Sequence, residues 1–190
     1  MRSKFLTAGL EGDFPHIIGL SAKKRHGKDT LGRQLVEQWG YRRIAFADAL
    51  YEEVAHRYGV SVATLQHPLT KEMPLDALGW LSPRQALQQH GMERRAEDAE
   101  YWVRQVERAV DECPGQRWVI TDVRLPNEAE YTESRGILVR ITRPGLPPAP
   151  DAHISETALD NWPFRYQVAN REGQSESMLR QLLGQLRQAA

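Results

Sequence analysis

The stretch HIIGLSAKKRHGKDT, residues 16–30, decides the fold of this 190-residue chain. Its first part, His16–Ser21, is an apolar run too short for a helix, so it predicts a buried strand. From Lys28 to Trp39 apolar residues recur at helical spacing, and Gly40 follows where a C-terminal cap would lie. The stretch therefore predicts a strand, a basic loop and a helix in direct succession.

The loop between this strand and helix is close to the pattern G-x-x-x-x-G-K-[ST]. In that pattern backbone N–H groups surround nucleotide phosphates, and the helix N-terminus adds its positive dipole. Lys28 is expected to contact the β- and γ-phosphates, and Gly27 to lie where a side chain would collide with them. Ala22 replaces the first glycine, and Asp29 comes before the hydroxyl residue Thr30. The candidate phosphate-binding residues are Ala22, Lys23, Lys24, Arg25, His26, Gly27, Lys28, Asp29 and Thr30. The alternative is a basic turn that happens to contain a glycine.

Strands and helices continue to alternate after this unit. A short strand is expected at Arg43–Ala47 and a helix from Ala49 to about Tyr58, which completes a βαβ pattern. Further elements are expected as strands at Trp118–Thr121, Ile137–Ile141 and Tyr166–Ala169, and as helices at Pro126–Arg135 and Ser175–Arg187. These elements predict an α/β fold with about five parallel strands flanked by helices.

Residues 59–116 interrupt the alternation because they contain no clear strand. Two parts of this segment, Pro83–His90 and Ala99–Val110, have helical periodicity. The proline-rich stretch 144–150 cannot continue either neighbouring element and is expected to be a loop. We expect a single domain over residues 1–190, with a helical insertion at 59–116 and a lid-like loop at 143–157.

Two acids follow predicted strands. Asp122 ends the strand at Trp118–Thr121, and such a carboxylate can lie beside a bound Mg²⁺. Asp48 follows the second strand, so both acids are expected at the sheet edge where open α/β sheets bind ligands. Thr30 and Asp122 are the candidate Mg²⁺ ligands, with a water held by Asp29 as another source. The alternatives are a turn-forming acid at 122 and a helix N-cap at 48.

The predicted insertion carries arginines and tryptophans that suit a nucleotide. Ser82 is a candidate helix cap, and Arg84 follows it in the first turn. Arg84, Arg94 and Arg124, which lies two residues after Asp122, are candidates for contacts to an acceptor phosphate. The alternative for each arginine is a position on the solvated surface. Trp80 and Trp102 could stack on a base, and a place in the core is the alternative for each.

Composition excludes several classes of function. Lys and Arg total 25, as do Asp and Glu, so no net charge draws the chain to nucleic acid or to a membrane surface. The one cysteine, Cys113, cannot form an internal disulfide or a cysteine-based zinc site, which fits a reducing compartment. There is no apolar run of roughly 20 residues and no signal peptide at the start. The expectation is a cytoplasmic protein without a membrane partner.

Five segments in order along the chain together resemble the bacteriophage-type deoxynucleoside monophosphate kinases. The most specific of them is Asp122-Val123-Arg124-Leu125-Pro126-Asn127-Glu128. The others are residues 19–30, Phe46-Ala47-Asp48, Pro83-Arg84-Gln85-Ala86-Leu87-Gln88 and His153-Ile154-Ser155-Glu156. The resemblance spans about residues 16–170.

The resemblance implies a P-loop kinase fold of the adenylate kinase type, with ATP and Mg²⁺ as the donor and a deoxynucleotide as the acceptor. Lys28 and its loop would then hold the donor phosphates. Asp122 and Arg124 would lie at the reacting centre, and Arg84 would contact the acceptor. Asp48 is a further candidate for the reacting centre, and Gln88 and Arg94 are further candidates for binding the acceptor. The sequence departs from the family pattern at Ala22 and at Tyr51, where a lysine is frequent.

Two other functions remain open at the level of sequence. A related phage kinase phosphorylates the hydroxymethyl group of 5-hydroxymethyluracil in DNA, and such an alcohol benefits from a carboxylate base, for which Asp48 and Asp122 are candidates. The other is a regulatory module that binds nucleotide without turnover. The expected partners are a small nucleotide acceptor or hydroxymethylated DNA, and a second copy of the chain in a possible homodimer.

Overall fold

The strand and helix expected at residues 16–39 are present in the computed structural model, which describes residues 14–146, 157–171 and 175–189. Strand β1 spans Ile17–Ala22 and helix α1 spans Lys28–Trp39. Gly40 ends α1 with a left-handed φ of 68°, and its N–H donates to the carbonyl of Leu35. The glycine is therefore the C-terminal cap that the sequence predicts.

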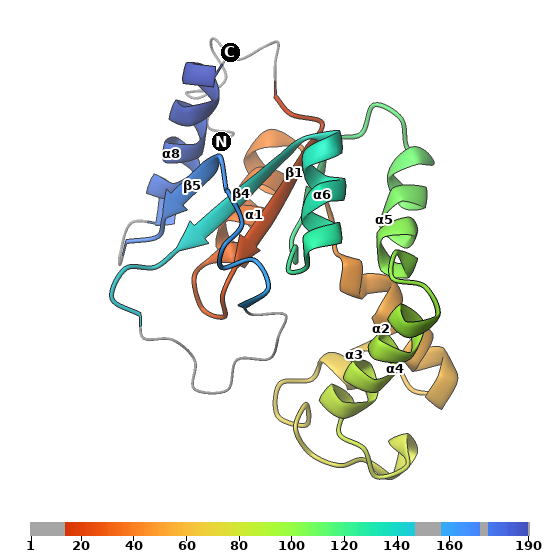
Figure 1. The fold of residues 1–190 in the computed structure, drawn as a ribbon. Helices are drawn as coiled ribbons and strands as arrows, with labels where there is room; N and C mark the ends of the chain where they lie inside the picture. Colours follow the sequence, from red (N-terminus) through yellow and green to blue (C-terminus); the bar gives the residue numbers. More distant parts are fainter. Residues whose placement is uncertain (1–13, 147–156, 172–174, 190) are drawn as a thin grey trace. The chain divides into compact units, whose positions relative to one another are not determined.

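A five-stranded parallel sheet with the order β2-β3-β1-β4-β5 forms the α/β unit (Figure 1). The strands that join β1 are β2 (Arg42–Ile44), β3 (Trp118–Ile120), β4 (Ile137–Thr142) and β5 (Tyr166–Ala169). Gly19 of β1 pairs with Ile120 on one side and with Leu138 on the other. The predicted α/β fold with a parallel sheet flanked by helices is confirmed, and the strand that leads into the basic loop lies at its centre.

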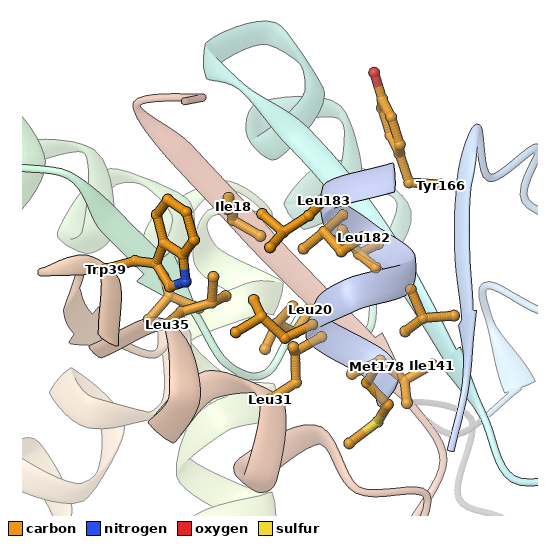
Figure 2. Close-up of a cluster of buried hydrophobic side chains, with 14 of the residues drawn as sticks. Ile18, Leu20, Leu31, Leu35, Trp39, Ile141, Tyr166, Met178, Leu182 and Leu183 are labelled. Carbon is orange, nitrogen blue, oxygen red and sulfur yellow. The ribbon is translucent and has the colours of Figure 1, made fainter. Parts of the chain in front are cut away.

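The two faces of β1 pack against different helices because neighbouring side chains of a strand point to opposite sides. Ile18 and Leu20 join the core beneath α1 and α8 (Ser175–Ala189), where Figure 2 shows them beside Leu31 and Leu182. On the other face lies α6 (Pro126–Arg135), which contacts β1 and β4. There a Cβ on Gly19 would lie 2.3 Å from Cγ2 of Thr132, so this position needs glycine for close packing.

Residues 44–114 form a second, helical unit, which begins earlier than the insertion expected from residue 59. Its elements are α2 (Phe46–Tyr58), α3 (Val62–Gln66), the 3₁₀ helix η1 (Asp76–Leu78), α4 (Pro83–Glu97) and α5 (Tyr101–Asp111). Val54, Leu65 and Leu78 form the centre of its core and are fully buried. Ser82 caps α4 as expected, because its hydroxyl accepts from the N–H of Gln85.

The predicted second strand is wrong in extent, and this changes the setting of Asp48. Strand β2 ends at Ile44, and the chain enters α2 at Phe46 instead of remaining extended to Ala47. The Asp48 carboxylate accepts a hydrogen bond from the Ala45 N–H at 2.8 Å, which satisfies a donor ahead of the first helical turn. Asp48 therefore lies inside the first turn of α2 and is neither a strand end nor the N-cap.

Candidate phosphate-binding site

The basic loop begins as the last residue of β1 and ends as the first turn of α1. Ala22 is still paired in the sheet, opposite Ile141 of β4. Positive φ angles occur further on, at Arg25 with 70° and at Gly27 with 101°. An extended position accommodates a Cβ without strain, so alanine in place of the first glycine leaves the course of the loop intact.

Cationic side chains surround the loop on the α/β unit. Arg140 of β4 donates to the hydroxyl of Ser21 at 3.1 Å, and with Lys23 it holds the Asp160 carboxylate at 3.1 and 2.7 Å. Burial, together with the positive charges of Arg140 and Lys23, lowers the pKa of His26. Because Lys23 and Arg140 share the single carboxylate of Asp160, an excess of positive charge remains beside the loop. This positive charge stabilises a bound anion.

Lys28 is positioned as the first residue of α1, where the helix dipole also favours an anion. Its ammonium lies 2.9 Å from the Asp29 carboxylate, whose side chain is 93% exposed. An ion pair with so exposed a partner contributes little to stability. A phosphate oxygen can therefore replace Asp29 as the partner of Lys28 at small cost to the fold.

Asp122 reaches the same edge of the sheet because β3 runs parallel to β1 and beside it. The chain continues along β1 after β3 ends, since the Val123 N–H donates to the Leu20 carbonyl at 3.2 Å. Next, the buried Glu128 carboxylate accepts from the N–H groups of Arg124 and Leu125 at 2.8 and 3.1 Å. The loop, Asp122 and Arg124 thus all belong to the α/β unit, on segments that leave neighbouring strands.

The oxygen donors of this unit are of the kind that Mg²⁺ prefers. Thr30 supplies a hydroxyl from the first turn of α1, and Asp122 supplies a carboxylate. In the described part of the chain, no three His, Cys, Asp or Glu side chains gather in a metal-binding arrangement. Magnesium in phosphoryl-transfer sites commonly uses one or two protein oxygens, with phosphates and waters completing the octahedron. The donor set at Thr30 and Asp122 fits that requirement.

The remaining predicted site residues belong to the helical unit. Asp48 lies in the first turn of α2, where its carboxylate accepts the Ala45 N–H. Arg84 lies in the first turn of α4 and donates to the exposed carboxylate of Glu72 at 2.6 Å. Gln88 is half-buried one turn further along α4. The acceptor contacts of these three residues remain predictions.

Arg94 takes part in a polar network that joins α2, α4 and α5. The Glu53 carboxylate accepts hydrogen bonds from His90 at 2.8 Å, from Arg94 at 3.0 Å and from the Tyr101 hydroxyl. His90 in turn accepts from Arg57 at 3.0 Å through Nδ1, so its Nε2 carries the proton given to Glu53. These contacts assign Arg94 a structural role, and its contact with an acceptor remains a prediction.

Replacing Glu53 with glutamine is expected to destabilise the protein by about 2 kcal/mol at pH 7, because hydrogen bonds to a charged acceptor are lost. Burial raises the pKa of Glu53, but the bonds from Tyr101, His90 and Arg94 outweigh it and leave the pKa below its usual 4.5. The stabilisation is complete above pH 4.5 and disappears as the pH falls through the lowered value. Urea unfolding from pH 7 to pH 3 checks this, with Glu52→Gln on the exposed side of α2 as the control. A difference in the free energy of unfolding between the wild type and Glu53→Gln that does not change with pH would contradict the role of the charge.

The two candidate base-stacking tryptophans differ in exposure. Trp102 is buried in α5, whereas Trp80 is 71% exposed, so a place in the core is wrong for Trp80.

Most of the expected lid at 143–157, His153 included, lies outside the described residues. Among the described helices, none is long and apolar enough to cross a membrane.

Asn170 is a residue of this site that sequence reasoning missed. It directly follows β5, and its side-chain amide donates to the carbonyl of His26 at 2.9 Å. A Cβ on Gly27 would lie 2.2 Å from that amide nitrogen. Glycine is therefore required at 27 both by its φ angle and by Asn170, a reason different from the expected collision with phosphate. The one signal in the sequence is its position at the carboxyl end of a strand.

The α/β fold and its loop are consistent with a P-loop kinase. No protein-family model matches the chain. A protein of Acanthamoeba polyphaga mimivirus that carries the provisional name deoxynucleotide monophosphate kinase is 28% identical over 158 residues, which cover 75% of this chain and 81% of the relative. The crystal structure of TT1252 from Thermus thermophilus matches with a TM-score of 0.52 and 17% identity, over 94% of this chain and 100% of that chain. The second likeness concerns the fold alone.

Proposed function

We propose that this protein is an ATP-dependent kinase that phosphorylates a deoxynucleoside monophosphate to the diphosphate. The observation that carries the proposal is the basic loop, which joins the central strand β1 to α1 amid the cations Lys23, Lys28 and Arg140. A strand, a phosphate loop and a helix N-terminus in this order are what binding of a nucleotide triphosphate requires. The likeness to the mimivirus protein supports the choice of acceptor.

Several groups of the α/β unit would bind the phosphate donor, ATP. Backbone N–H groups of the loop and the Lys28 ammonium bind the β- and γ-phosphates, where they offset charge that grows during transfer. Thr30 and Asp122 would hold Mg²⁺, which would supply positive charge that neutralises the phosphates during transfer. Arg124 follows Asp122 and would contact the transferred group.

The acceptor side draws on the helical unit. A nucleoside monophosphate is ionised at neutral pH, so its attacking oxygen needs cations and no carboxylate base. Arg84 is the candidate for that cation, because its present partner Glu72 is exposed and can be exchanged for a phosphate. Asp48 already accepts the Ala45 N–H, which suits a positioning role better than that of a base.

Transfer of label from [γ-³²P]ATP tests this proposal against both alternatives. The protein is incubated with Mg²⁺ and each of the four deoxynucleoside monophosphates, and in parallel with DNA that contains 5-hydroxymethyluracil. We expect labelled diphosphate from at least one nucleotide and no label in DNA. Label in DNA alone would establish the DNA kinase instead, and an absence of ADP release with every acceptor would favour the non-catalytic module.

A further inference from the structure

We infer that Asn170 is a positioning residue of the phosphate loop, which turns the Gly27 N–H toward the bound phosphate by holding the carbonyl of His26. The inference rests on the proposed function, because it requires that the loop bind a nucleotide phosphate. Asn170 directly follows β5, the last strand of the sheet, and it is far in sequence from the loop that it would orient.

Asn170 is itself held in place by the sheet. Its backbone N–H donates to the Thr142 carbonyl at the end of β4, at 2.7 Å. Its side-chain Nδ2 then donates to the His26 carbonyl at 2.9 Å. Two short bonds therefore connect the ends of β4 and β5 to the peptide that precedes Gly27.

The planarity of the peptide converts this bond into an orientation. In a trans peptide the C=O and the N–H point in opposite directions, and the peptide between His26 and Gly27 is trans. Since Asn170 holds the oxygen on one side, the Gly27 N–H points to the other side of the loop. Within the described residues no group accepts this N–H, so a phosphate oxygen can do so.

Gly27 and Asn170 match each other sterically. Gly27 has a φ of 101°, and an added Cβ would lie 2.2 Å from Nδ2 and 3.1 Å from Cγ of Asn170. The amide group therefore occupies space that only glycine leaves open. Any side chain at 27 would displace Asn170 and release the peptide.

The His26 ring provides a second anchor on the same residue. Its Nδ1 accepts the backbone N–H of Arg143 at 3.0 Å, just beyond the end of β4. With the carbonyl bound by Asn170 and the ring bound by Arg143, His26 cannot rotate its peptide without breaking one of two hydrogen bonds. The loop is thereby preorganised, so its N–H groups need not reorient when phosphate arrives.

The test compares Asn170→Ala and Asn170→Asp with a control substitution in α8 that affects the same segment of the chain. Both variants lose the donor, and the second also adds a negative charge beside the loop. The control is Gln181→Ala, because Gln181 of α8 bonds both the N–H and the C=O of Ala169, the residue before Asn170, and its other hydrogen bond goes to Ser177. It loosens the same segment without releasing His26.

We expect Kd for Mg·ATP to rise about tenfold in Asn170→Ala and about 100-fold in Asn170→Asp, with kcat lowered about 10²-fold in the latter. KM for the acceptor and the Kd in Gln181→Ala should stay within about twofold of the wild type. Equal weakening of ATP binding in Gln181→Ala at a similar melting temperature would reduce Asn170 to a structural role and overturn the inference.

Calorimetric binding of ATP without acceptor separates this inference from the proposed function. Wild-type protein that binds ATP but phosphorylates no nucleotide would contradict the proposed function. The inference would then still be supported by weaker ATP binding in the Asn170 variants. In wild-type protein, the ¹H–¹⁵N resonance of Gly27 should also shift downfield when Mg·ATP is added. Unchanged ATP binding in both variants, or an unmoved Gly27 resonance, would overturn the inference even if the kinase is active.

Discussion

Lys28→Ala is expected to fold normally and to lose phosphoryl transfer, with kcat lowered about 10²- to 10³-fold, the span seen when one preorganised donor is removed from a transition state. The folded protein loses little, because the Lys28 ammonium contacts the exposed carboxylate of Asp29. The reaction loses more, since this ammonium would neutralise phosphate charge that grows as the γ-phosphoryl group leaves.

Steady-state kinetics and thermal unfolding of the same preparations check the Lys28 prediction. Arg180→Ala serves as the control, because it removes an exposed cation of α8 whose ion pair is with Glu176 and not with a residue of the loop. The melting temperature should match the wild type in both variants, and kcat should fall in Lys28→Ala alone. Wild-type turnover in Lys28→Ala would mean that the loop does not bind the transferred phosphates.

Asp122→Asn is the second substitution with a large expected effect. If Asp122 holds Mg²⁺, an amide in its place weakens the metal site, and kcat at a fixed millimolar Mg²⁺ concentration should fall by about 10²-fold or more. Part of this loss should be recovered as the Mg²⁺ concentration is raised, because the site is weakened and not removed. The substitution keeps the shape of the side chain, so the strand end should retain its structure.

A titration of activity with Mg²⁺ distinguishes this role of Asp122 from that of a base. Glu130→Gln on the exposed side of α6 is the control, and its Mg²⁺ dependence should equal that of the wild type. A rate in Asp122→Asn that stays low at every Mg²⁺ concentration would instead favour a base at this position. An undiminished rate would remove Asp122 from the reacting centre.

Much of the α/β unit is predictable from local patterns. The apolar runs in β1, β3 and β4 are short and bounded by polar residues, so each can be recognised as a buried strand without knowledge of its neighbours. The loop at residues 22–30 is recognisable because its chemistry depends on a contiguous stretch between a strand and a helix. Gly40 likewise marks the end of α1 through a local requirement for a left-handed φ.

The errors and omissions have tertiary causes. Residues Ile44–Ala47 are apolar enough for either a strand or a first helical turn. The hydrogen bond from the Ala45 N–H to the Asp48 carboxylate stabilises the start of the helix. Trp80 has a left-handed φ of 66° just before Ser82 caps α4, and a turn of this kind exposes a ring that composition alone would bury. Asn170 lies 144 residues from its partner His26, so no local pattern connects the two.

The most direct test of the proposed kinase is to follow the products by ³¹P NMR, with the protein mixed with Mg·ATP and the deoxynucleoside monophosphate that accepts label best. The proposed kinase activity predicts that resonances of ADP and of the deoxynucleoside diphosphate appear together, in equal amounts and at equal rates, and that both form about 10²- to 10³-fold more slowly with Lys28→Ala. Growth of ADP with inorganic phosphate and no deoxynucleoside diphosphate, or an unchanged spectrum with all four nucleotides, would contradict it.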